Sequence, residues 1–122
     1  MSLPLQGLRM LVVEDEALVA MLVEDILAEL GCVVVDVAGT LETGLAAAKA
    51  SASSIDGAIL DINLGGAKVF PIADLLQARG VKFVFATGYG VAGIEPRYAS
   101  SPVLAKPFQR EALEELLVAT LI

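Results

Sequence analysis

Five short apolar runs recur along the chain, each rich in Val, Ile, Leu or Phe. They are Leu8–Val13, Val33–Val37, Ala58–Leu60, Val81–Ala86 and, more weakly, Val103–Ala105. None alternates strictly between apolar and polar positions, which is typical of strands covered by helices on both faces. The pattern therefore predicts five buried strands.

Helical spacing of apolar residues fills most of the intervals between these runs. The first helix presents an apolar face and ends at Gly31, a favoured residue just beyond a helix; its face comprises Val19, Leu22, Val23, Ile26 and Leu30. A second helix runs from a Thr40 cap to about Ala50, with Leu41, Leu45 and Ala48 facing inward. We expect both helices to pack on the sheet.

Two further helices complete the pattern. The third includes Val69, Ile72, Leu75 and Leu76, with Pro71 in its first turn and Arg79–Gly80 at its end. The last includes Leu113, Leu116, Leu117 and Leu121. Between Gly88 and Pro102, glycine and proline leave room for at most a short helix near Val91–Ala99, and we expect this stretch to be the most mobile.

Strands and helices that alternate five times predict an α/β fold, a doubly wound (βα)5 three-layer sandwich around a parallel sheet. The domain spans residues 8–122 and follows a loose N-terminal tail over residues 1–7. Ligands of such folds bind at the carboxyl ends of the strands. The polar residues at those ends are therefore the candidates for a functional site.

These candidates are Glu14 and Asp15, Asp61 and Asn63, Thr87, and Lys106, which follow the first, third, fourth and fifth runs. Each alone has a simpler interpretation, as a helix cap, a turn residue or a surface lysine. Three carboxylates about 4–5 Å apart would repel one another by roughly 3–4 kcal/mol per pair. A fold holds them together only if positive charge joins them, and one lysine with an oxygen-binding divalent ion such as Mg²⁺ would supply it.

Composition excludes several other classes of function. The chain has 8 basic and 15 acidic residues, a net charge of −7, which argues against nucleic-acid binding. It has no His, which excludes catalysis or metal binding by His within this chain, and the single Cys32 excludes an internal disulfide. The longest apolar run, Ala17–Val23, is far too short for a membrane span, and no signal peptide is visible. We expect the chain of 122 residues to be a soluble cytoplasmic protein with a single domain.

The ordered motifs VVED, ILDIN, FATG and AKPF together resemble the receiver domain of bacterial two-component response regulators over essentially the whole chain. The resemblance implies a flavodoxin-like sheet with strand order 2-1-3-4-5. It also implies that Asp61 is the phosphoacceptor and that Glu14, Asp15 and Asp61 bind Mg²⁺ together with the backbone carbonyl of Asn63. Thr87 resembles the switch hydroxyl of the family.

Lys106 resembles the lysine that pairs with the phosphoryl group, and it precedes Pro107 in a Lys-Pro peptide that is often cis in this family. The sequence departs from the family at Val103, where an aromatic switch residue is usual, and at Leu64-Gly65-Gly66, which replaces a Pro-Gly pair. We therefore consider Tyr89, two residues beyond Thr87, as the switch aromatic.

The segment Phe85-Ala86-Thr87-Gly88-Tyr89-Gly90 is similar to the FATGUY subgroup, which is associated with HWE-type histidine kinases. By this resemblance the chain takes a phosphoryl group from a histidine kinase or a histidine phosphotransfer protein and signals to a downstream protein. It would be a signalling phosphoprotein that catalyses only its own phosphorylation and dephosphorylation.

Two alternatives remain open. A phosphatase of the haloacid dehalogenase type also uses an Asp nucleophile, but it carries a second Asp where this chain has Asn63, which cannot transfer a proton. A receiver-like interaction module that is never phosphorylated usually lacks one of the key residues, and all are present here.

Overall fold

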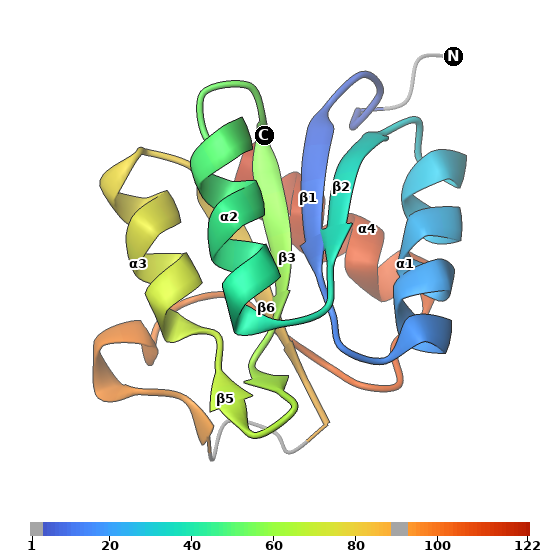
Figure 1. Cartoon of the computed structure of the whole chain (residues 1–122). Helices are drawn as coiled ribbons and strands as arrows, with labels where there is room; N and C mark the ends of the chain where they lie inside the picture. Colours follow the sequence, from blue (N-terminus) through green and yellow to red (C-terminus); the bar gives the residue numbers. More distant parts are fainter. Residues whose placement is uncertain (1–3, 89–92) are drawn as a thin grey trace.

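The computed structural model of the chain describes residues 4–88 and 93–122. Five parallel strands form its central sheet in the order β2-β1-β3-β6-β7 (Figure 1). Their bounds are β1 Arg9–Val13, β2 Val33–Ala38, β3 Gly57–Asp61, β6 Lys82–Thr87 and β7 Val103–Ala105. Counted along the sheet's own strands, this is the order 2-1-3-4-5, so the predicted flavodoxin-like fold is confirmed.

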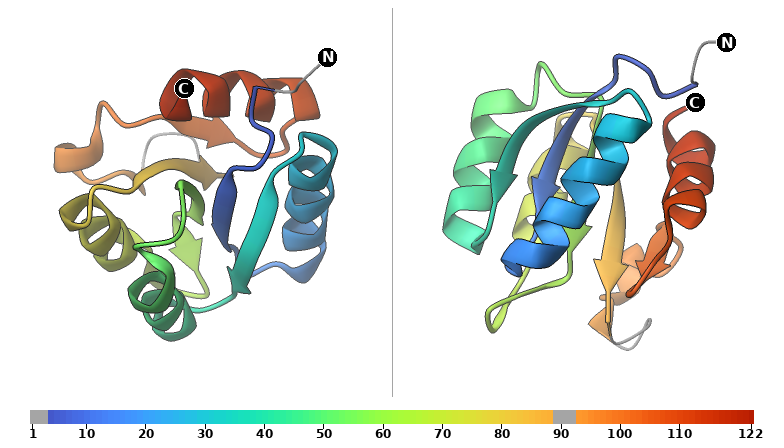
Figure 2. Two further views of the ribbon diagram at one scale, coloured as in Figure 1. Left: turned by 90° about the horizontal axis from the view of Figure 1, so that it is seen from above. Right: turned by 90° about the vertical axis from the view of Figure 1, so that its right-hand side faces the viewer.

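Helices cover both faces of the sheet, with α2 and α3 on one side and α1 and α4 on the other (Figures 1 and 2). Their bounds are α1 Ala17–Glu29, α2 Leu41–Ser51, α3 Phe70–Ala78 and α4 Arg110–Leu121. Where the sequence predicts a short helix over residues 91–99, the described residues 93–99 include the 3-10 turn η2, Pro96–Tyr98. Proline disfavours a longer helix here because it lacks a backbone N–H.

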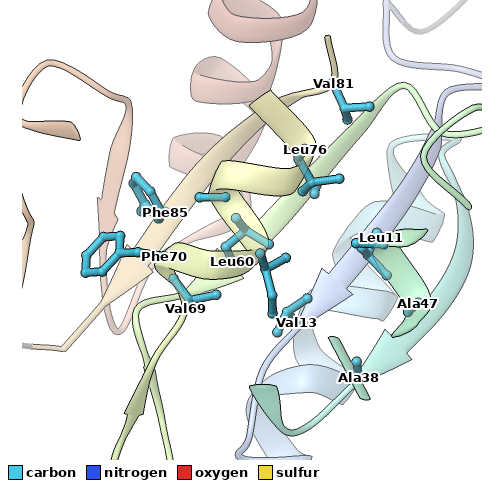
Figure 3. Packing of buried hydrophobic residues seen from close by; sticks show 14 of the residues in the cluster. Leu11, Val13, Ala38, Ala47, Leu60, Val69, Phe70, Leu76, Val81 and Phe85 are labelled. Carbon is cyan, nitrogen blue, oxygen red and sulfur yellow. The ribbon is translucent and has the colours of Figure 1, made fainter. Parts of the chain in front are cut away.

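Successive residues of each central strand face opposite cores. Leu11 and Val13 of β1 pack toward α2 and α3, in the cluster drawn in Figure 3, whereas Met10 and Val12 pack toward α1 and α4. All four side chains are fully buried. Burial on both faces explains why the strands read as continuous apolar runs rather than as alternating ones.

Helix ends follow the signals in the sequence. Thr40 caps α2: its hydroxyl accepts a hydrogen bond from the backbone N–H of Thr43 at 3.0 Å. Gly31 follows the end of α1 with φ +86°, a conformation that glycine adopts without steric cost. Midway along α2, Gly44 lies directly against Ile72 of α3, so the two helices pack closely at a residue without a side chain.

Two expectations about apolar residues are wrong. Residues 4–7 are not a loose tail: Leu5 is buried among the residues that pack on α1, and the Gly7 amide donates to the Gly31 carbonyl at 2.8 Å. Conversely, Leu22 does not face the core and is 49% exposed. Leu18 and Met21 of the same helix are also exposed, so the apolar residues of α1 extend beyond the face that packs on the sheet. No described helix is long and apolar enough to cross a membrane.

A small hairpin follows β3 and lies at the carboxyl end of the sheet (Figure 1). Its antiparallel strands are β4, Asn63–Leu64, and β5, Ala67–Lys68. Gly65 and Gly66 connect them with φ values of +58° and +95°, as tight two-residue hairpin turns require. The Gly-Gly pair that departs from the family pattern thus forms a turn that the sequence analysis did not predict.

Candidate functional site

The carboxyl ends of the central strands bring the predicted site residues together. Glu14 directly follows β1, and Asp61 ends β3 opposite Ala86 of the neighbouring strand β6. Thr87 ends β6 and is paired in register with Ala105, the residue before Lys106. Since Glu14, Asp61 and Thr87 are all buried, the backbone itself holds three polar side chains at one edge of the sheet.

Lys106 joins two of the carboxylates. Its Nζ lies 2.6 Å from Glu14 Oε1 and 3.2 Å from Asp61 Oδ2, with the lysine side chain only 14% exposed. The Lys106 backbone N–H donates to the Thr87 carbonyl at 2.9 Å, which fixes the lysine beside the end of β6. The peptide bond between Lys106 and Pro107 is cis, as the resemblance implies.

This crowding of charge shifts the pKa values in the site. Burial, together with the nearby Glu14 carboxylate, raises the pKa of Asp61 to about 7, although Lys106 opposes the shift. Burial alone would lower the pKa of the Lys106 ammonium, but Glu14 and Asp61 raise it above its usual value. Burial would raise the pKa of Asp15, but hydrogen bonds to its carboxylate, including one from the Gly65 amide at 3.0 Å, hold it below its usual value. The site therefore carries more negative charge than Lys106 balances.

An open cavity of about 430 Å³ gives solvent access to these groups. Its lining combines carboxylates, one lysine and glycines: Asp15, Glu16, Asp61, Asn63, Gly65, Gly66, Gly88 and Lys106. Carboxylate oxygens of Glu14, Asp15 and Glu16 lie within 4.8 Å of one another. Hard oxygen ligands with excess negative charge, open to solvent, fit a divalent cation such as Mg²⁺.

Two residues, one lining this cavity and one hydrogen-bonded to its lining, were not among the sequence candidates. Glu16 contributes to the carboxylate cluster, and its backbone N–H donates to Glu14 Oε2 at 3.1 Å. Its place in the Glu14-Asp15-Glu16 run is the signal that could have identified it. Lys68, on β5, donates a hydrogen bond to the side-chain oxygen of Asn63. No sequence pattern pointed to Lys68, because its position depends on the unpredicted hairpin.

An aromatic cluster beside β6 consists of Phe70, Phe83, Phe85 and Tyr98, and β7 contributes no ring to it. Val103 is half-buried there, and the Tyr98 ring enters instead from η2, stacked on Phe70 with centroids 5.7 Å apart and edge-on to Phe85 at 5.4 Å. The Tyr98 hydroxyl donates to Asp74 of α3 at 2.6 Å. Tyr89, the aromatic that the sequence analysis singled out as a switch, lies outside the described residues.

No family model matches the chain, and no curated protein matches it. Among solved structures, SdrG from Sphingomonas melonis Fr1 is 41% identical, with a TM-score of 0.80 over 93% of this chain and 95% of SdrG. A BeF3-activated conformation of SdrG, from Pseudomonas melonis Fr1, is 39% identical, with a TM-score of 0.76 over 97% of this chain and 96% of that one.

Two similar structures come from PhyR proteins. The response regulator PhyR from Brucella abortus is 25% identical, with a TM-score of 0.80, and the match covers 98% of this chain but 50% of PhyR. The REC (receiver) domain of the PhyR response regulator from Erythrobacter litoralis shares the fold, with a TM-score of 0.80 at 24% identity over 93% of this chain and 89% of that domain. Given the identity to SdrG over nearly the full length of both chains, this chain belongs to the receiver domains of response regulators.

Proposed function

We propose that the chain is a phosphoacceptor receiver of a two-component phosphorelay and that Asp61 accepts the phosphoryl group. The observation that carries the proposal is the Lys106 ammonium, which lies 3.2 Å from Asp61 Oδ2 at the carboxyl end of the sheet. Phosphoryl transfer needs a nucleophile in line with the donor and positive charge beside the equatorial oxygens, and little else. Asp61 would supply the nucleophile and Lys106 the positive charge.

In the proposed reaction, an Asp61 carboxylate oxygen attacks the phosphorus of a phosphohistidine. A P–O bond forms as the P–N bond breaks, and the leaving imidazole nitrogen takes a proton from water. The donor histidine belongs to a histidine kinase or a phosphotransfer protein, because this chain has no His. Lys106 then pairs with the phosphoryl oxygens, and Thr87, buried at the end of β6, offers its hydroxyl to them.

Glu14, Asp15 and Asp61, with the backbone carbonyl of Asn63, are the residues that would hold Mg²⁺. Bound there, the ion would neutralise the charge that develops on the transferred group. Glu16 adds a further carboxylate at the edge of the same cluster. The excess of carboxylates over Lys106 supports this assignment, since a divalent cation would relieve their repulsion.

Incubation with acetyl phosphate and Mg²⁺, followed by intact-protein mass spectrometry, tests the proposal. We expect the mass of one phosphoryl group on the wild-type chain and none on Asp61→Asn or in the presence of a chelator. The matched control is Asp25→Asn, the same chemical change at an exposed position of α1, which should label like the wild type. Normal labelling of Asp61→Asn, or labelling that ignores chelation, would overturn the assignment.

The subgroup of the receiver, its kinase and its downstream target are also proposals. The segment from Phe85 to Gly90 supports membership of the FATGUY subgroup, with an HWE-type kinase as phosphodonor and a downstream protein as target. The chain would act in the cytoplasm as a signalling protein, with no substrate beyond its own Asp61. Phosphotransfer from a panel of phosphorylated histidine kinases tests this: HWE-type kinases should transfer fastest, and equal transfer from all classes would contradict it.

A further inference from the structure

Lys68 places a second ammonium group beside Asn63, which lines the cavity of the proposed phosphoacceptor site. It lies directly opposite Asn63 in the antiparallel β4–β5 hairpin, so the two side chains lie on the same face. Its Nζ donates to the side-chain oxygen of Asn63, which lines the cavity. The same Nζ would lie 3.6 Å from a Cβ placed on Gly93, so the ammonium lies between the hairpin and the segment that leads into η2.

The charge of this ammonium is not neutralised by a neighbour. Its hydrogen-bond partner is a neutral amide oxygen, and no ion pair among residues 4–88 and 93–122 includes Lys68. Lys106, by contrast, contacts two carboxylates. A lysine so close to an acidic cluster gains most by pairing with a carboxylate, yet the hairpin holds Lys68 on an amide instead.

An anion that entered the cavity would offer the Lys68 ammonium a charged partner in place of the neutral Asn63 amide. Hydrogen bonds between an ammonium and a charged oxygen are roughly twice as strong as those to neutral acceptors. The Lys68 ammonium would therefore exchange the Asn63 amide for a phosphate oxygen, at little cost, because both the amide and the released side chain are open to water. Lys106 cannot make the same exchange without leaving Glu14 and Asp61 unpaired.

We infer that Lys68 is a phosphodonor-binding residue: its ammonium, held beside the cavity by Asn63, attracts and contacts the oxygens of an anionic phosphodonor. The inference rests on the proposed function, and it adds a residue outside the predicted site. Lys106, the lysine that lines the cavity, is already paired with Glu14 and Asp61, so Lys68 would add positive charge beside the cavity for a negative donor.

The test compares Lys68→Met with Lys82→Met. Both remove one exposed lysine charge, but Lys82 begins β6, at the opposite end of the strand from Thr87. We expect Lys68→Met to slow phosphorylation by acetyl phosphate and Mg²⁺ about three- to tenfold at low salt, and less than about twofold at roughly 0.5 M salt, where charges are screened. Lys82→Met should stay close to the wild type, and Lys68→Arg should recover most of the rate.

A second phosphodonor distinguishes the loss of the Lys68 charge from a disturbance of the hairpin structure. Phosphoramidate carries less negative charge than acetyl phosphate, so Lys68→Met should slow its reaction less, whereas a variant that merely disturbed the hairpin would slow both donors alike. If the wild-type chain takes up no phosphoryl group, the proposed function fails and the inference fails with it. If the wild type is labelled but Lys68→Met matches Lys82→Met at low salt, or its effect ignores salt and donor charge, only the inference is overturned.

Discussion

Replacing Asp61 with Asn should stabilise the chain when no metal is present. The substitution keeps the size of the side chain and removes the buried carboxylate that lies beside Glu14. In the wild type, folding takes the Asp61 carboxylate out of water and places it near another negative charge, and Lys106 at 3.2 Å compensates only in part. Removal of the charge removes that cost.

The magnitude follows from the pKa of Asp61. Its folded value of about 7 lies well above the ordinary value of 3.8, and one pKa unit corresponds to about 1.4 kcal/mol. At pH 8 the ionised Asp61 therefore lowers the free energy of unfolding by at most about 4 kcal/mol. This figure already includes the attraction to Lys106, and solvent in the open cavity screens the charges, so we expect a net gain of about 1–3 kcal/mol.

The sign of the pH dependence is part of the prediction. Between pH 4 and 7 the folded chain binds more protons at Asp61 than the unfolded chain, so the wild-type free energy of unfolding falls as the pH rises through this range. At pH 5 Asp61 is already protonated in the folded chain. Folding at pH 5 still requires the unfolded Asp61 to take up a proton, so the advantage of Asp61→Asn should be less than half as large at pH 5 as at pH 8, where it is fully present.

Urea titrations followed by far-ultraviolet circular dichroism, in chelator at pH 5 and pH 8, measure these differences. Asp25→Asn is the matched control and should change the free energy of unfolding by less than about 0.5 kcal/mol. Added Mg²⁺ should then stabilise the wild type more than Asp61→Asn, because a ligand stabilises the state that binds it. A wild type as stable as Asp61→Asn at pH 8, or an equal advantage at both pH values, would refute the reasoning.

Two further predictions concern the packing of α3. Gly44→Ala should change the free energy of unfolding by less than about 1 kcal/mol in urea titrations, because its Cβ would overlap only the movable Cδ1 end of Ile72 and Ala favours the helix by about 1 kcal/mol; a loss above about 2 kcal/mol would mean that Ile72 cannot shift. Tyr98→Phe should cost about 1–2 kcal/mol, because it leaves Asp74 without the phenol donor at 2.6 Å. Burial, with Asp74, raises the pKa of Tyr98 to about 12, so wild-type stability should fall between pH 10 and 12 and the difference from Tyr98→Phe should shrink; a constant difference would contradict this.

Much of the fold could be predicted because strand burial and helix ends are local signals. Strands β1 and β3 are buried on both faces, so their residues are apolar at successive positions. Such a continuous apolar run is easy to recognise in the sequence. Thr40 and Gly31 mark helix ends through their own backbone and side-chain chemistry. Leu5 was missed because its burial depends on a contact with α1 across the chain, and no periodicity exists in so short a segment.

The site likewise contains residues that the sequence predicts and one that it does not. Asp61, Thr87 and Lys106 could be found because a parallel sheet brings every strand's carboxyl end to one edge, so knowledge of the strands alone places them. Lys68 reaches this edge by another route, through a hairpin of two-residue strands that exists because Gly65 and Gly66 permit its turn. Such strands are too short to show a hydrophobic period. A residue that a turn brings to the site, rather than a strand end, is therefore found only in the folded chain. The Lys68 ammonium is such a group: it adds a positive charge for the phosphodonor that the sequence motifs of this receiver do not indicate.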